Sequence, residues 1–242
     1  MPVRWVVDDK ANATLWRELS ELPLSLAGPG GRVLDLGGGN GNFVAPLLRT
    51  GGWLVTVDVD RAALRSANPR IRSVAGSLLD LPFRDGAFDA AAGRAVLHHV
   101  PANLDRAVQE AKRVVRNGAI LLFQEPTDGN LIANVARRRL PTERHDPHER
   151  PLPAEAYLAA VRRELEVVEV RHEFLLSYLL PHIVGRLPIE RRGFARLLTR
   201  VLFRIDRLIL TALPKMRTRA AYVSILARRP GVASPSFGTT LK

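Results

Sequence analysis

Two acidic residues and a cluster of glycines give this sequence its clearest chemical signal. Residues 33–43 read V-L-D-L-G-G-G-N-G-N-F, so Asp35 lies in an apolar run that leads directly into glycines. Glycine lets a backbone turn sharply and come close to a bound molecule, where a Cβ would intrude. A second apolar run, 53–57, ends at Asp58. We therefore expect two carboxylates at strand ends beside a glycine loop that a bound molecule can approach closely.

The spacing of the glycines argues against two nucleotide-binding motifs. The dinucleotide fingerprint requires glycines at relative positions one, three and six, and the sixth position counted from Gly37 is Asn42. A P-loop requires a Gly-Lys-Ser/Thr sequence, and none follows these glycines. We therefore expect neither NAD nor a P-loop phosphate at this loop.

An acidic residue followed by glycines at every second position resembles the first motif of class I S-adenosylmethionine-dependent methyltransferases. Further matches follow in the family's order, at Leu81-Pro82-Phe83, Phe88-Asp89 and His99, and then in the turn 114–119. The resemblance covers residues 30–126, and within the family it is to the ubiquinone/menaquinone-methyltransferase-like group. Several ordered motifs are far more specific than a lone glycine pattern.

The resemblance implies S-adenosyl-L-methionine as the cofactor. Asp35 and the glycine loop would hold its methionine end and Asp58 its ribose, whereas Asp60 would cap the next helix. Alone, Asp58 would be read as a turn residue, but its spacing from the glycines favours the ribose. Ser77 stands where the family has an acidic residue near the adenine, so one charge is lost there. The predicted cofactor-binding residues are Asp35, Gly37, Gly38, Gly39, Gly41, Asp58, Val59, Ser77, Leu78, Gly93 and Arg94.

Four further residues are candidates for the acceptor side of the site. His99 matches the family's Leu-x-His position, where a neutral imidazole could take a proton from an acceptor; alternatively, it only orders its loop. Glu125, at the tip of the fifth strand, is expected to point into the cleft and hydrogen-bond the substrate. His145 and His148 lie among carboxylates, but flanking prolines and arginines favour a substrate-facing or surface loop over a metal site. We predict no metal.

Alternating strand and helix patterns predict how these residues are positioned. The fold class is α/β, a Rossmann-like, doubly wound sheet of seven strands, mostly parallel, with the last strand antiparallel. Asn117 is expected to take a left-handed conformation before the fifth strand. Helices are expected over 11–27, 101–115 and 153–164, and strands over 33–36, 53–57, 89–93, 120–126, 165–171 and 220–227.

Length and composition indicate one domain, over residues 1–229. The chain has 242 residues, 46% of them hydrophobic, which suffices for one substantial core. Residues 30–126 would form the cofactor-binding core. A basic loop, 127–150, and a helical insertion between strands six and seven, 178–219, would cap the substrate cleft. Residues 230–242 are rich in Ser, Thr, Gly and Pro and are predicted to be disordered.

A net charge of +12 requires an explanation beyond the cofactor, and many of the arginines lie in the insertion. Apolar residues from Phe194 to Ile209 recur there at helical spacing, with arginines largely opposite. Three interpretations stay open: a lid that packs its apolar stripe on the domain, an amphipathic helix over 190–213 on an anionic membrane, or a nucleic-acid surface. Nucleic acid is disfavoured, because Gly93-Arg94-Ala95-Val96 stands where base-modifying relatives carry Asn/Asp-Pro-Pro-Tyr.

The function predicted from these features is methyl transfer from S-adenosylmethionine to a small-molecule or lipid-like acceptor, by in-line displacement in a capped cleft. The alternatives are a methyltransferase-like protein that binds cofactor without catalysis, and an RNA methyltransferase. The chain has no cysteine, which excludes disulfides and thiolate chemistry. No apolar run reaches the ~20 residues of a membrane span, and no signal peptide is recognisable. We therefore predict a cytoplasmic protein, with peripheral membrane contact as an option.

Overall fold

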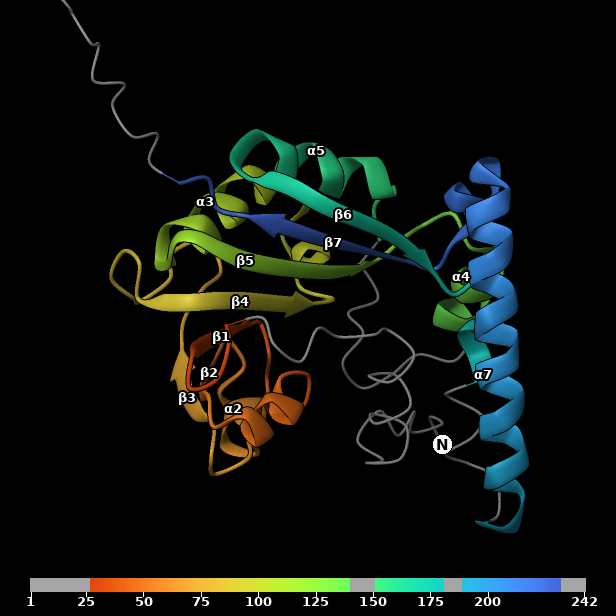
Figure 1. The fold of residues 1–242 in the computed structure, drawn as a ribbon, viewed down its shortest axis with the longest axis horizontal. Coiled ribbons are helices and arrows are strands. Elements are labelled where there is room, and N and C mark those ends of the chain that lie inside the picture. Colours follow the sequence, from red (N-terminus) through yellow and green to blue (C-terminus); the bar gives the residue numbers. More distant parts are fainter. Residues whose placement is uncertain (1–26, 140–150, 181–188, 232–242) are drawn as a thin grey trace, which may run out of the picture.

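The computed structural model describes residues 27–139, 151–180 and 189–231, which form one seven-stranded sheet in the order β3-β2-β1-β4-β5-β7-β6 (Figure 1). Strand β7 runs antiparallel to both of its neighbours, β5 and β6, and the other paired strands are parallel. The predicted fold class is therefore confirmed. The strands are β1 Arg32–Leu36, β2 Trp53–Asp58, β3 Arg72–Ala75, β4 Phe88–Arg94, β5 Val115–Pro126, β6 Glu166–Glu173 and β7 Tyr222–Arg228.

Helices α3 (Leu104–Val114) and α5 (Ala154–Glu164) lie side by side on one face of the sheet (Figure 1). Strand residues alternate between the two faces, so neighbours such as Val33 and Leu34 belong to different hydrophobic clusters. The cluster under α3 and α5 is the larger of these two, and it includes the fully buried Tyr157. The short elements are η1 Ala45–Thr50, α2 Arg61–Arg65, η2 Leu97–His99, η3 Pro101–Asn103, α4 Leu131–Arg139, η4 Ser177–Leu179 and η5 Pro214–Arg219.

The order of the strands reverses direction between β1 and β4. From β1 the chain builds outward through β2 and β3, and it then returns to the other side of β1 for β4. Connections that leave in opposite directions open a crevice at the carboxyl ends of the two strands, and ligands of open α/β sheets bind at such a point. The fold therefore places its ligand crevice where the glycine loop follows β1.

Some predicted boundaries and one predicted conformation were wrong. The helix expected over 101–115 begins as a 3-10 turn and becomes α-helical only at Leu104. Strand β5 begins at Val115 rather than 120, and Gly118 has the positive φ of +74° expected of Asn117. The flexible glycine takes the left-handed position because it lacks a Cβ.

Helix α7 (Ile189–Ala212) packs on the domain through a face other than its apolar stripe. Its buried side chains are Thr199, Phe203, Asp206 and Leu210, whereas Phe194 is 74% exposed. This exposure argues against one of the three open interpretations, the one in which the helix packs its apolar stripe on the domain. Buried polar atoms explain the orientation: the Asp206 carboxylate accepts hydrogen bonds from three backbone N–H groups, those of residues 175–177, and from the hydroxyl of residue 177.

Of the helices in the described ranges, none is long and apolar enough to cross a membrane. His145 and His148, nearly all of the helix predicted over 11–27, and most of the tail predicted over 230–242 lie outside the described residues.

Candidate cofactor and acceptor site

The glycine loop after β1 and the carboxylate at the end of β2 are in direct contact. Asp58 Oδ2 accepts a hydrogen bond of 2.9 Å from Gly39 N, and its Oδ1 accepts one of 2.8 Å from Asp60 N. The Asp60 side chain accepts from Ala62 N and Ala63 N at the start of α2, which confirms its predicted role as a helix cap. The two elements expected to form a ligand seat therefore lie side by side.

Backbone geometry in the loop requires glycine at several positions. Gly37, Gly39 and Gly41 have φ values of +59°, +52° and +73°, which side chains rarely adopt. A Cβ on Gly38 would lie 2.0 Å from Asp35 Oδ2 and 2.6 Å from Thr56 Oγ1. The loop thus rests directly on the Asp35 carboxyl.

Asp35 is fully buried beneath this loop, and neither of its carboxyl oxygens has a hydrogen-bond partner among the described residues. Burial, with a smaller contribution from Asp58, raises the pKa of Asp35 well above its usual range. A buried polar group without a partner is costly, and a cation seated above the loop would offset that cost. The site therefore fits a ligand with positive charge over the loop.

The residues predicted to contact the adenine lie next to the end of β2. Gly76 N donates a hydrogen bond of 3.0 Å to the Asp58 carbonyl, so Ser77 follows immediately beside it. Ser77 Oγ accepts from Leu79 N at 3.1 Å and keeps one lone pair for a ligand. Leu78 is half-buried, and Val59 is 73% exposed at the rim.

The end of β4 connects the loop to the rest of the carboxyl edge. Gly93 is buried, and a Cβ there would lie 2.8 Å from Val96 Cγ1. The Arg94 guanidinium lies 5.7 Å from the centre of the Phe43 ring, within the range of a cation–π contact. Ala95 has φ +53° and donates its N–H to the carbonyl of residue 124 at 2.8 Å.

Glu125 does not reach the cleft as predicted. Its side chain is fully buried; Oε1 accepts from Val96 N at 3.0 Å and Leu97 N at 2.9 Å, and Oε2 lies 3.2 Å from His98 Nδ1. The carboxylate therefore shapes the turn η2. Successive strand residues point to opposite faces of the sheet, and this alternation explains the error. Gln124 points to the face opposite the one to which Glu125 points.

His99 is exposed in this same turn, just past β4. Its ring centre lies 4.2 Å from that of the buried His98, and its backbone N–H donates to the Val96 carbonyl at 3.2 Å. The ring therefore lies near the edge of the crevice, and its predicted part in catalysis stays a prediction.

Gln124, Ser224 and Glu173 form a buried polar cluster on β5, β7 and β6 that the motif-based prediction missed. Gln124 Nε2 donates to Glu173 Oε2 at 2.8 Å and to Ser224 Oγ at 3.1 Å. Three different strands contribute one residue each, so no local spacing marks them. The available signal was the polarity of Gln124 and Ser224 within otherwise apolar runs.

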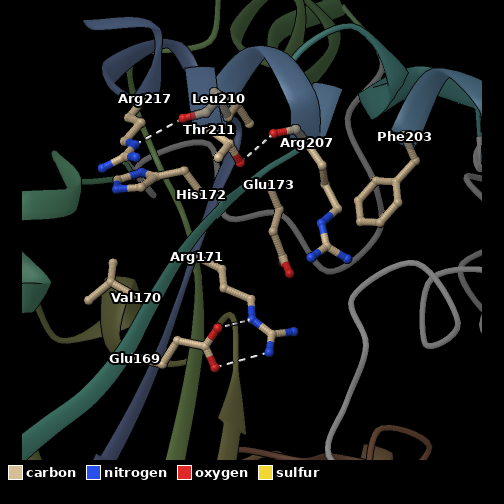
Figure 2. A pocket seen from close by; sticks show the side chains of 10 residues that line it. All are labelled: Glu169, Val170, Arg171, His172, Glu173, Phe203, Arg207, Leu210, Thr211 and Arg217. Atoms are coloured by element: carbon tan, nitrogen blue, oxygen red, sulfur yellow. Dashed lines mark hydrogen bonds and ion pairs between the residues drawn. The ribbon is translucent and has the colours of Figure 1, made fainter. Parts of the chain in front are cut away.

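A cavity of about 220 Å³ lies between β6 and α7, beside this cluster (Figure 2). Glu169 and Arg171 form a bidentate ion pair in it, with N–O distances of 2.6 and 3.0 Å. Arg207 and Phe203 reach in from α7. The cavity is therefore bordered by both charge signs and by an aromatic ring.

Comparisons with known proteins agree with this arrangement. Residues 34–123 match a family described as a methyltransferase domain. The demethylmenaquinone methyltransferase of Mycobacterium tuberculosis strain H37Rv is 37% identical over 117 residues, which are 47% of this chain and 49% of that protein. The relative from Mycolicibacterium gilvum is 35% identical over 118 residues, 47% of this chain and 51% of that protein. The chain thus spans about half the length of the curated relatives it matches.

A solved structure described as the geranyl diphosphate C-methyltransferase of Streptomyces coelicolor, in complex with Mg²⁺, geranyl diphosphate and S-adenosyl-L-homocysteine, has the same fold. Its TM-score is 0.58 at 19% identity, over 88% of this chain and 79% of that one. At this identity the likeness shows the fold alone. The glycine loop, the Asp58 contact and the family match agree with one another. Residues 34–123 belong to a class I S-adenosylmethionine-dependent methyltransferase domain, distantly related to the demethylmenaquinone methyltransferases.

Proposed function

We propose that this protein transfers the methyl group of S-adenosylmethionine to a small-molecule or lipid-like acceptor, by in-line displacement in a capped cleft. The observation that carries the proposal is the 2.9 Å hydrogen bond from Gly39 N to Asp58 Oδ2. It holds the glycine loop against the β2 carboxylate beside the crevice between β1 and β4.

The residues of the loop and of the strand ends suit the parts of this cofactor. Each Asp58 oxygen accepts one backbone N–H and retains lone pairs for the ribose hydroxyls. The buried Asp35 carboxyl favours positive charge above Gly38, where the methionine end would lie. Ser77 and Leu78 would border the adenine. When bound, the cofactor supplies an activated methyl group on a sulfonium centre.

Catalysis would then depend mainly on positioning. Holding a nucleophile within ~3–3.5 Å of a reacting carbon in a closed, dry cleft accounts for much of the rate in such displacements. Arg94 and His99 would border the acceptor. The segments 127–150 and 178–219 would cap it, with α7 beyond the carboxyl ends of β4 and β6 (Figure 1). Similarity to demethylmenaquinone methyltransferases supports a lipid-like acceptor.

A pulse of methyl-labelled S-adenosylmethionine into cell extract tests this function. We expect label in the lipid or small-molecule fraction with the wild-type protein, and much less with the Asp58→Ala variant. Label in nucleic acid would favour an RNA methyltransferase. Absence of transfer by protein that binds S-adenosylhomocysteine would favour a cofactor-binding protein without catalysis.

We also infer that α7 makes peripheral contact with an anionic membrane from the cytoplasmic side. Its exposed apolar side chains fall within about 100° of the helix circumference, on the side away from the buried Phe203. A column of arginines follows the adjacent side, where anionic headgroups would lie. The apolar residues are Phe194, Leu197, Leu198, Val201, Ile205 and Leu208, and the arginines are Arg196, Arg200, Arg204 and Arg207.

Liposome flotation tests this membrane contact. We expect the protein to float with vesicles that contain phosphatidylglycerol and to remain in solution with phosphatidylcholine alone. Changing Arg196, Arg200 and Arg204 to Glu should abolish flotation. The matched control changes the exposed Arg61, Arg65 and Arg70 to Glu, which alters the net charge equally. Equal partitioning of both variants would contradict the role of α7.

A further inference from the structure

Polar side chains form one row across four neighbouring strands at the carboxyl edge of the sheet. Arg94 on β4 pairs in register with Gln124 on β5, Gln124 with Ser224 on β7, and Ser224 with Arg171 on β6. Register partners on neighbouring strands point to the same face of a sheet. The row therefore has one guanidinium at each end and two neutral hydrogen-bonding groups between them.

Glu173 adds a buried carboxyl to this row. It lies two residues beyond Arg171 on β6, on the same face, and is 4% exposed. Its Oε2 accepts hydrogen bonds from Gln124 Nε2 at 2.8 Å and Ser224 Oγ at 3.0 Å. Within the described ranges, Oε1 makes no hydrogen bond, and Glu173 lines the cavity beside β6 (Figure 2). One oxygen is thus fixed, and the other is left for a ligand.

Gln124 carries a second acceptor without a partner. Its side chain is 2% exposed, and no described residue donates a hydrogen bond to its Oε1. A buried amide oxygen normally has a partner, because leaving it unpaired costs its full desolvation penalty. Gln124 Oε1 therefore lies buried without a donor in the same cluster in which Glu173 Oε1 makes no hydrogen bond to a described residue.

The backbone is strained next to Arg94 and next to Glu173. Ala95 has φ +53° and Phe174 has φ +62°, and in the part of the chain that the structure describes these are the non-glycine residues with positive φ. Ala95 directly follows Arg94, and Phe174 directly follows Glu173. Such conformations are energetically unfavourable and concentrate at functional sites. The strain is thus located where these two side chains are presented.

The charges around Glu173 define the ligand that would fit it. Burial raises the pKa of Glu173 to about 7, against the opposing effects of its hydrogen bonds and of Arg171 and Arg94. The guanidiniums of Arg94 and Arg171 would repel an ammonium group, whereas Glu173 Oε1 can accept a hydrogen bond from a donor. A neutral hydroxyl meets both conditions. The charged and titratable groups around this carboxyl are Arg94, Glu169, Arg171, His172, Tyr178, Arg207, Arg217 and Tyr222.

We propose that Glu173, held in place by Gln124 and Ser224, binds a hydroxyl group of the methyl acceptor and accepts its proton. The O–H bond of the acceptor breaks, the proton passes to Glu173 Oε1, and the electron pair stays on the acceptor oxygen. Glu173 then returns the proton to solvent. The identity of this ligand as the methyl acceptor rests on the proposed function. None of the site residues predicted from sequence motifs lies on β6 or β7.

Calorimetric titration with 1-naphthol and with 1-methoxynaphthalene, which lacks only the hydroxyl proton, tests the proposal. The titrations use the full chain, saturated with S-adenosylhomocysteine. At pH 8 we expect the wild-type protein to bind 1-naphthol about 10-fold more tightly than its methyl ether, the scale of one hydrogen bond to a charged group. This preference should shrink as the pH falls through about 7.

Glu173→Gln should reduce the preference several-fold and remove its dependence on pH, a readout that a merely structural role would not move. Glu166→Gln, on the same strand but exposed and outside the cavity, is the matched control and should keep both properties. Ser224→Ala is a second variant: it removes a hydrogen bond that lowers the pKa of Glu173, so the pH midpoint should rise.

Three outcomes would overturn the proposal: equal affinity for the two probes, no binding of 1-naphthol, or an unchanged pH-dependent preference in Glu173→Gln. The titrations are repeated without S-adenosylhomocysteine. If S-adenosylhomocysteine does not bind, this result counts against the proposed function. The preference for 1-naphthol over 1-methoxynaphthalene, measured without S-adenosylhomocysteine, still decides the role of Glu173.

Discussion

The two halves of the carboxyl edge are built in different ways. The cofactor half takes its loop from residues 37–41 and its carboxylate from Asp58, each within one contiguous motif. The proposed acceptor half takes Arg94, Gln124, Glu173 and Ser224 from four different strands. Spacing along the chain reveals the first half and conceals the second, because strand pairing and not sequence proximity brings the latter residues together.

The two halves also treat a buried carboxyl differently. Asp35 is buried with no hydrogen-bond partner in the described ranges, whereas Glu173 has two donors on one oxygen and guanidiniums nearby. Burial raises the pKa of both carboxyls. The difference is consistent with the two proposed ligand chemistries, a positively charged group above the glycine loop and a neutral hydroxyl beside Glu173.

The largest expected effect is a loss of stability that leaves the cofactor half unaffected. Asp206→Ala should lower the free energy of unfolding by about 3–5 kcal/mol, because three backbone N–H groups of the segment after β6 lose their acceptor. Urea unfolding measures this loss. The control Asp105→Ala removes an exposed ion pair with Arg163 and should cost less than about 1 kcal/mol. A weakened affinity for S-adenosylhomocysteine in Asp206→Ala would show that the two halves are not independent.

The next effect is on the pH dependence of stability. The pKa of Glu173 rises from 4.5 to about 7 on folding, so between these values the folded state binds the proton that the unfolded state has lost. This contribution is present below pH 4.5 and is lost as the pH rises through 7, by about 3 kcal/mol. Urea unfolding of the wild-type protein and of Glu173→Gln at pH 5 and pH 8 measures it. Identical pH slopes in the two proteins would contradict the raised pKa.

A smaller effect is expected in the cofactor half. Gly38→Ala should destabilise the protein by about 1–3 kcal/mol and weaken binding of S-adenosylhomocysteine, because the new Cβ would lie 2.0 Å from Asp35 Oδ2. Gly193→Ala is the control. Its Cβ would meet nothing within 4 Å, and alanine should stabilise α7 by up to about 1 kcal/mol. Thermal unfolding and calorimetry measure both, and equal behaviour of the two variants would contradict the tight packing of the loop.

Features that depend on neighbouring residues could be predicted from the sequence, and features that depend on residues far along the chain could not. The Asp60 cap and the β1 and β2 strands were predicted correctly because each depends on neighbouring residues. The orientation of Glu125 was not, because the face to which a strand residue points depends on which face each helix covers. The packing face of α7 could not be chosen from the sequence for a related reason: one buried carboxylate, Asp206, outweighed an apolar stripe. Neither a buried acceptor nor its partners on another element can be read from helical periodicity.

The most direct test of the cofactor site is calorimetric titration of the folded protein with S-adenosylhomocysteine. We expect one binding site, and Asp58→Ala should weaken binding by roughly 1.5–3 kcal/mol, the scale of hydrogen bonds to a charged group. Asp60→Ala, two residues away, should retain the affinity and lose only about 1 kcal/mol of stability with its helix cap. Absence of binding to well-folded protein, or equal affinity in wild type and Asp58→Ala, would contradict the assignment of this crevice to S-adenosylmethionine.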